Sequence, residues 1–144
     1  MRSLEQRLSA IEDELALRRL INRYHKTSDA LDWAGWSETF SEDAVFENQF
    51  GPHHGRQEIH DLCKKRFGKA FQAFQHVIVN LDFDIAGDSA TGTGNLLFAG
   101  VRNKDEPDKY YLAGGRYDWT FRRETDGWKI HTGRLEFVWN NAAR

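Results

Sequence analysis

The sequence places an aspartate, a histidine and a tyrosine where they can carry out proton transfer. Tyr24 lies on the apolar stripe of the first predicted helix, and Asp29 follows where that helix should end. His76 opens the first long predicted strand. An aspartate beside a histidine in an apolar cavity is a general acid/base device, because the carboxylate fixes the imidazole tautomer and stabilises its protonated form. Asp29 and His76 are therefore a candidate dyad, and Tyr24 is a candidate proton donor.

Each of these residues also has a purely structural interpretation. Asp29 can be a surface carboxylate in a turn, His76 can be bonded to backbone at a strand end, and Tyr24 can fill the core. The alternation of side chains along this strand conflicts with an inward-facing His76. His76 shares its side of the strand with Ile78 and Asn80, while the opposite side is the apolar one. Either a bulge reverses the strand after His76, or the apolar side packs against an interface and the histidine side faces the cavity.

Other polar residues are weaker candidates for chemistry. His53 and His54 look like a metal pair, but adjacent residues in a turn rarely converge on one ion, so we expect a solvated loop and no metal site. Arg134 can bind a substrate oxygen or pair with an acidic side chain. The single Cys63 allows no intramolecular disulfide. No glycine-rich nucleotide motif occurs, so we expect no cofactor.

The elements that must position these residues change character halfway along the chain. Apolar residues first recur at helical spacing and then alternate with period two. The predicted helices cover 3–29, 32–40 and 56–73. The predicted strands cover 44–47, 76–85, 91–102, 110–123 and 128–139, and a turn is expected over 51–55. Three helices followed by a meander of long strands predict an α+β fold. Strands this long must coil, so the helices would close a strongly curved, mostly antiparallel sheet into a cone around a ligand pocket.

Composition limits the function classes. The 144 residues carry a formal net charge of −2, which argues against an electrostatic grip on nucleic acid. No signal peptide or membrane-length apolar run is apparent, so we expect one soluble, cytoplasmic domain over 1–144. Phe 10, Trp 5 and Tyr 4 make up 13% of the chain, and these rings must fill a core, line a cavity or cover an interface. The predicted apolar wall comprises Trp33, Phe46, Leu96, Phe98, Tyr111, Trp119 and Phe137.

Several motifs together resemble the SnoaL-like branch of the nuclear transport factor 2 superfamily. They are Arg23-Tyr24, the segments 29–33, 40–46 and 55–59, and the stretches 114–117 and 122–130. Within this branch the chain is most similar to scytalone dehydratases, hexachlorocyclohexane dehydrochlorinases and bile acid 7α-dehydratases. The resemblance implies a cone-shaped α+β barrel, a catalytic aspartate at Asp29 and a catalytic histidine at His76. Tyr24 matches the first-helix tyrosine of the bile acid enzymes, whereas the other pocket tyrosines and second histidine of scytalone dehydratases have no clear counterpart.

The resemblance and the residues together predict a cofactor-free lyase. It would remove water or a similar leaving group from a cyclic, mostly apolar molecule, steroid- or polyketide-like, with His76 as base, Asp29 orienting it and Tyr24 as donor. An isomerase or polyketide-cyclase activity would begin with the same proton abstraction, and a non-catalytic binding or assembly domain is a further alternative. The family and the spare apolar strand face predict a homo-oligomer, either a dimer or a trimer.

Overall fold

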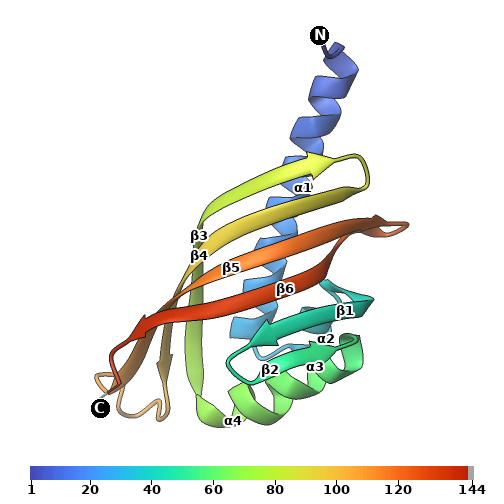
Figure 1. Ribbon diagram of the computed structural model, residues 1–144. Helices are drawn as coiled ribbons and strands as arrows, with labels where there is room; N and C mark the ends of the chain where they lie inside the picture. Colours follow the sequence, from blue (N-terminus) through green and yellow to red (C-terminus); the bar gives the residue numbers. More distant parts are fainter. Residues whose placement is uncertain (143–144) are drawn as a thin grey trace.

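A computed structural model describes residues 1–142 of the chain as helices packed against one curved, six-stranded sheet (Figure 1). The helices are α1 (Leu4–Asp29), α2 (Trp33–Ser37), α3 (Arg56–Leu62), the π-helix η1 (Cys63–Phe67) and α4 (Gly68–Ala70). The strands are β1 (Phe40–Asn48), β2 (Gly51–His54), β3 (Ala73–Ala86), β4 (Ser89–Val101), β5 (Tyr110–Glu124) and β6 (Gly127–Asn140). The sheet order is β2-β1-β6-β5-β4-β3. Only the β1–β6 pair is parallel within this part of the chain, so the predicted α+β cone fold is confirmed.

The long helix α1 begins at a capping box. The Ser3 side chain accepts from the Gln6 N–H, and the Gln6 side chain accepts from the Ser3 N–H. The second half of α1 buries Leu17, Ile21 and Tyr24 against the sheet. The first half extends beyond the sheet (Figure 1) and leaves four apolar side chains exposed. These are Leu4, Leu8, Ile11 and Leu15.

Three local predictions are corrected by the structure. The second helix ends at Ser37 rather than near residue 40, because the chain enters β1 at Phe40. The expected turn over 51–55 is largely strand β2, which pairs with β1 at the edge of the sheet. Pro52 is tolerated there because an edge strand does not need every backbone N–H. The third predicted helix is not one continuous α-helix, because π-helical backbone occupies Cys63–Phe67.

The outer face of the sheet carries a row of apolar side chains. Val77, Leu97, Gly114 and Trp139 are paired in register across β3, β4, β5 and β6. A side-chain Cβ at Gly114 would lie 2.2 Å from the Trp139 ring, so glycine is required for the tryptophan to lie flat on the sheet. The side chains of Val77, Leu97 and Trp139 remain exposed on this face. Over residues 1–142, no helix combines the length and apolar character needed to cross a membrane.

Candidate active site

Asp29 and His76 meet between the end of α1 and the start of β3. The His76 Nδ1 lies 2.7 Å from Asp29 Oδ1. The backbone N–H of His76 also donates to the same carboxylate, with both oxygens 3.1 Å from the nitrogen. The His76 side chain is 7% exposed and that of Asp29 is 23% exposed. The carboxylate therefore binds both the ring and the strand backbone of a buried histidine.

The end of α1 fixes the position of Asp29. The backbone N–H of Leu31 donates to Ser28 O and that of Asp32 donates to Thr27 O, which is a Schellman motif. Leu31 occupies the left-handed position of this motif with φ 59°, where glycine is the usual residue. The helix thus stops abruptly after Asp29, and the carboxylate faces β3 instead of a further helical turn.

A bulge in β3 determines that His76 faces inward. The pairing register of β3 with β4 shifts between Val79 and Asp82, and Asn80 within that interval has a left-handed φ of 56°. Before the bulge, the inward positions include Phe74 and His76, which are buried. After it, alternation is reversed and the opposite set of residues faces the core. The conflict in the sequence pattern is therefore resolved by a strand bulge, one of the two alternatives that the pattern left open.

The hydrogen bond to Asp29 assigns the protons of the His76 ring. A carboxylate only accepts hydrogen bonds, so Nδ1 carries the proton in this pair. In the neutral imidazole, Nε2 then has a free lone pair. No side chain or backbone group within residues 1–142 forms a hydrogen bond with Nε2. This nitrogen is available to accept a proton from a bound molecule.

The His76 ring borders a small cavity inside the cone. The cavity has a volume of about 20 Å³, roughly the space of one water molecule. Its lining residues are Tyr24, Ser28, Trp36, Phe46, Asn48, Cys63, Phe67, His76, Tyr117 and Leu135. Of the residues predicted from sequence, the structure brings Tyr24, Phe46 and His76 to this cavity. Asp29 lies behind His76 and reaches the cavity only through the imidazole.

The remaining predicted wall residues lie elsewhere in the core. Phe98 is paired with His76 across the strands, and the two ring centroids are 5.1 Å apart, so it supports the histidine from the side. The others are buried or partly buried but do not line the cavity; they are Trp33, Leu96, Tyr111, Trp119 and Phe137. Arg134 is exposed on the outer face, because Gly133 and Leu135 on either side of it are buried and strand residues alternate. The structure therefore separates Arg134 from the cavity.

Several cavity residues were not singled out from sequence as site residues. They are Ser28, Trp36, Asn48, Cys63, Phe67, Tyr117 and Leu135. Tyr117 could have been predicted to face inward, because it lies on the apolar, alternating face of the strand predicted over 110–123. Phe67 and Cys63 reach the cavity from the π-helical segment η1, whose backbone no residue spacing predicts. Such single-turn π segments often occur at functional sites.

Burial controls the ionisation of the polar cavity groups. Burial raises the pKa of the Tyr24 and Tyr117 phenols and of the Cys63 thiol. These groups are therefore protonated at neutral pH, so the phenols are hydrogen-bond donors and the thiol is a poor nucleophile. His25, one turn before Asp29 on α1, has a pKa lowered by burial. A neutral His25 offers Asp29 no cationic partner on the same helix.

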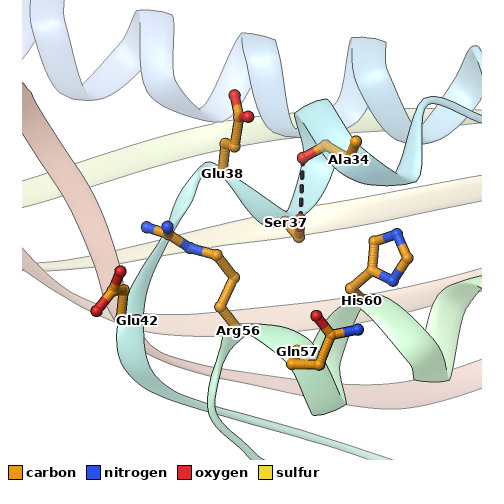
Figure 2. A pocket seen from close by; sticks show the side chains of 7 residues that line it. All are labelled: Ala34, Ser37, Glu38, Glu42, Arg56, Gln57 and His60. Carbon is orange, nitrogen blue, oxygen red and sulfur yellow. Dashed lines mark hydrogen bonds between the residues drawn. The ribbon is translucent and has the colours of Figure 1, made fainter.

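A larger hollow lies apart from the dyad. It is an open groove of about 530 Å³ between α2 and α3, with Glu38, Glu42, Arg56 and His60 among its lining residues (Figure 2). The Arg56 guanidinium donates from Nε and Nη2 to the carbonyl oxygen of Phe40, so it secures the start of β1. Across residues 1–142, no group of three or more potential ligands is arranged to hold a metal ion. Among the groove residues, Arg56 therefore has a structural role at the start of β1.

Comparison with known proteins identifies the family and the fold. Residues 9–134 match the family described as SnoaL-like domain. A search of curated proteins found no significant sequence match. A nuclear transport factor 2-like protein from Novosphingobium aromaticivorans is 24% identical with a TM-score of 0.84, and the alignment covers 96% of this chain and 92% of that one.

Two further solved structures share the fold. The hexachlorocyclohexane dehydrochlorinase LinA-type3 from Novosphingobium barchaimii is 19% identical, with a TM-score of 0.82 and coverage of 93% of this chain and 92% of that one. A scytalone dehydratase-like protein from Novosphingobium aromaticivorans is 18% identical, with a TM-score of 0.83 and coverage of 94% and 90%. At these identities the likeness shows a common fold.

Proposed function

The chain belongs to the SnoaL-like domain family, and on this premise we propose that it is a cofactor-free lyase that uses His76 as its base and Asp29 as the orienting partner. The observation that carries the proposal is the 2.7 Å contact between His76 Nδ1 and the Asp29 carboxylate beside an interior cavity. Two structural neighbours, the dehydrochlorinase and the scytalone dehydratase-like protein, are named for elimination reactions. Their names support the reaction class, while the dyad geometry supports the residues.

The reaction is an elimination from a cyclic, mostly apolar molecule. His76 Nε2 removes a proton from a carbon beside an activating group such as a carbonyl, and the electrons of the broken C–H bond form a C=C bond. The bond to the leaving hydroxyl breaks, and the hydroxide takes the proton from Nε2, so that water departs and His76 is again neutral. Asp29 stabilises the transient imidazolium, and a buried phenol, with Tyr24 the first candidate, donates to the leaving oxygen or the carbonyl.

The cavity must enlarge to admit such a substrate. Its volume of about 20 Å³ is far below the several hundred Å³ of a typical ligand pocket. The wall formed by Cys63 and Phe67 belongs to η1, where the backbone departs from regular α-helix. We place the entrance at this wall, because Phe67 lies beside the His76 ring and its movement would widen the cavity without breaking the hydrogen bond between Asp29 and His76.

The test is an elimination assay on a panel of cyclic β-hydroxy ketones of increasing ring number. Formation of the conjugated enone is followed by ultraviolet absorbance. We expect turnover by the wild type and a loss of about 10²- to 10⁴-fold in kcat for Asp29→Asn and for His76→Gln. His54→Gln, at an exposed histidine on β2, is the matched control and should retain full activity. Unchanged turnover in both dyad variants would refute the proposal.

An isomerase or cyclase would share the first step and differ in the product. An isomerase returns the proton to a different carbon, so its product keeps the hydroxyl group and the mass of the substrate. Mass spectrometry of the same reactions separates the two outcomes, because elimination lowers the product mass by one water. A panel that neither reacts nor binds would favour a non-catalytic binding or assembly domain.

A further inference from the structure

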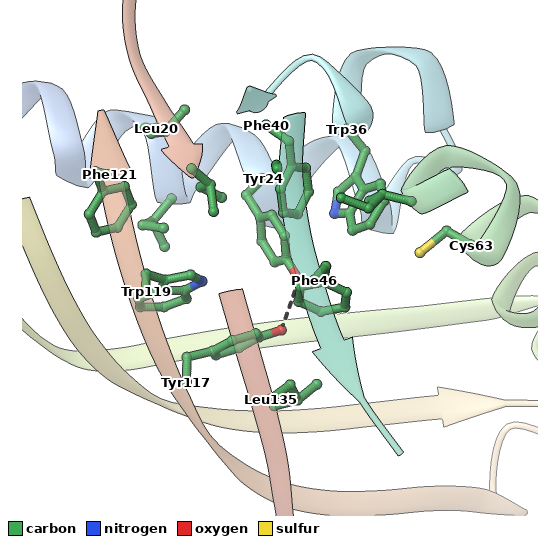
Figure 3. Close-up of a cluster of buried hydrophobic side chains, with 14 of the residues drawn as sticks. Leu20, Tyr24, Trp36, Phe40, Phe46, Cys63, Tyr117, Trp119, Phe121 and Leu135 are labelled. Atoms are coloured by element: carbon green, nitrogen blue, oxygen red, sulfur yellow. Dashed lines mark hydrogen bonds between the residues drawn. The ribbon is translucent and has the colours of Figure 1, made fainter. Parts of the chain in front are cut away.

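Asn48 brings a buried amide to the wall of the cavity that contains His76. It ends β1 two residues after Phe46, and both residues are buried while Glu47 between them is exposed. Alternation along the strand therefore turns Asn48 toward the same interior as Phe46, which lines the cavity with Tyr117 (Figure 3). Asn48 is 8% exposed and also lines this cavity. No step of the proposed elimination uses its amide.

The turn that follows β1 fixes the orientation of the Asn48 amide. The backbone N–H of Phe50 donates to Asn48 Oδ1 at 2.9 Å. A backbone N–H can bond only to the oxygen of an amide, so the other end of the group is Nδ2, which carries two donors. Within residues 1–142, neither of these donors has a hydrogen-bond acceptor. The end of the amide that is left for a bound molecule is therefore the donor end.

Other polar groups of the cavity wall have partners within the protein. His76 Nδ1 is bonded to Asp29. The hydroxyl oxygens of Tyr24 and Tyr117 are 3.2 Å apart, within hydrogen-bond distance of each other (Figure 3). The hydroxyl of Ser28 rotates and can turn to a carbonyl of its own helix. A planar amide that is held by its oxygen has no such freedom, so its donors depend on a molecule in the cavity.

We propose that Asn48 is a specificity-determining residue whose Nδ2 donates a hydrogen bond to an oxygen of the substrate. This inference rests on the proposed function and narrows its substrate class. His76 and a phenol serve the reacting β-hydroxy ketone unit, so the amide is left for an oxygen elsewhere on the ring system. The substrate is therefore a cyclic ketone with a further oxygen substituent. A molecule without that oxygen leaves buried donors unpaired, which lowers its affinity.

The test compares two ligands of nearly equal size that differ in one acceptor atom. A methoxy-2-tetralone is paired with the ethyl-2-tetralone substituted at the same position, for each position of the aromatic ring, and only the ether oxygen of the substituent accepts a hydrogen bond. Dissociation constants are measured by calorimetry for the full chain and for the same chain with Phe67→Ala, which gives the ligand more room. For at least one position, Asn48→Leu should shift the ratio of the two affinities toward the ethyl ligand by about 3- to 10-fold, the effect of one neutral hydrogen bond.

A second variant separates recognition from a structural role of Asn48. Asn48→Asp keeps the oxygen that accepts from the Phe50 N–H and removes both donors. It should recover at least part of any melting temperature lost in Asn48→Leu, and it should shift the affinity ratio as Asn48→Leu does. Gln49→Leu, at the exposed next residue, is the matched control and should keep the wild-type ratio.

Each outcome supports the assignment of Asn48 or overturns it. A ratio that stays unchanged in Asn48→Leu at every ring position would mean that the amide serves only a bound water, and this result overturns the inference. Absence of binding in both backgrounds does the same. A ratio that changes in Asn48→Leu and stays at the wild-type value in Asn48→Asp would show a purely structural asparagine. If the ratio depends on Asn48 but Asp29→Asn and His76→Gln keep full elimination activity, the proposed function fails while the oxygen site stands.

Discussion

The Asp29 carboxylate accepts hydrogen bonds from both the ring and the backbone of His76. Asp29 therefore restrains His76 in two ways. The ring bond selects the Nδ1–H tautomer, and the backbone bonds fix the start of β3 relative to the end of α1. Removing the carboxylate therefore affects both the protonation pattern of the imidazole and its place in the cavity. Asparagine keeps the shape of Asp29 and some of its acceptor capacity, so Asp29→Asn isolates the effect of the charge.

Replacing Leu31 by glycine should stabilise the protein. Leu31 has a φ of 59° in the motif that ends α1, and its side chain is exposed. A left-handed conformation costs a residue with a Cβ about 1–2 kcal/mol, most of which glycine avoids. We expect Leu31→Gly to raise the free energy of unfolding by about 1 kcal/mol in denaturant titrations. Leu31→Ala keeps the backbone penalty and should show no gain; an equal gain in both variants would contradict the argument.

Asp13 should support stability in a pH-dependent way. Arg123 donates to both oxygens of Asp13 at 2.7 and 2.9 Å, and the Trp128 indole N–H donates at 3.2 Å. These contacts join α1 to the β5–β6 hairpin. The hydrogen bond from Arg123 lowers the pKa of Asp13. We expect Asp13→Asn to lower the free energy of unfolding by about 1–2 kcal/mol at neutral pH, as for a charged hydrogen bond that is partly solvated.

The sign of the pH effect follows from the lowered pKa of Asp13. The folded state favours the carboxylate, so its contribution is complete above the unfolded value of about 3.9. It disappears as the pH falls through the lower folded value. The stability difference between wild type and Asp13→Asn should therefore be constant from neutral pH down to about pH 5 and shrink in more acidic solution. Glu12→Gln on the exposed side of α1 is the control, and a difference that stays constant in strong acid would contradict this account.

Shortening Phe67 should enlarge the cavity and admit larger molecules. The Phe67 ring lies 6.0 Å from Phe98 and 6.5 Å from His76, centroid to centroid. Phe67→Ala should cost about 1–3 kcal/mol of stability, since the side chain is only partly buried. It should also increase the rise in melting temperature caused by 2-tetralone, a cyclic ketone. Phe50→Ala, at an exposed ring, is the control, and a smaller ligand effect in Phe67→Ala than in wild type would show that the entrance lies elsewhere.

The outer face of the sheet is a proposed contact with a second copy of the chain. Its apolar row consists of Val77, Leu97 and Trp139. Further along β5 and β6, Arg116 is paired with Glu136, and Asp118 is paired with Arg134. A face that carries both charges in balance can pair with a rotated copy of itself. We expect Leu97→Lys to reduce the mass measured by sedimentation equilibrium to that of a monomer. The same substitution at exposed Leu8 on α1 should leave the assembly intact, and dissociation by Leu8→Lys alone would place the contact on the helix.

The helix and strand that carry the site residues could be predicted from the sequence more fully than the residues that line the cavity. The apolar stripe and the capping box were sufficient to locate α1 and therefore to place Tyr24 and Asp29 at its end. The alternating pattern was sufficient to locate β3, but it indicated that His76 would lie on the polar side of the strand. The bulge at Asn80, which resolves this conflict, depends on local backbone conformation and on pairing with β4. Asparagine tolerates the left-handed region, yet its presence alone does not identify such a bulge.

The cavity wall was harder to predict because it depends on curvature and helix packing. Trp119 alternates on the apolar face of its strand as Tyr117 does, yet only Tyr117 borders the cavity. Which of two inward rings fills the core and which meets open space depends on the coiling of the sheet against α1. The contribution of Phe67 depends likewise on the π-helical backbone of η1, which residue spacing does not encode.

Hydrogen exchange at a carbon acid tests the central claim most directly. 2-Tetralone is incubated in D₂O with the protein, and deuterium incorporation beside the carbonyl is followed by NMR. If His76 Nε2 is the base and Asp29 orients it, the wild type should accelerate exchange above buffer, and Asp29→Asn and His76→Gln should each reduce that acceleration by about 10²-fold or more. His54→Gln should match the wild type. Exchange that proceeds equally fast in the wild type and both dyad variants would contradict the account.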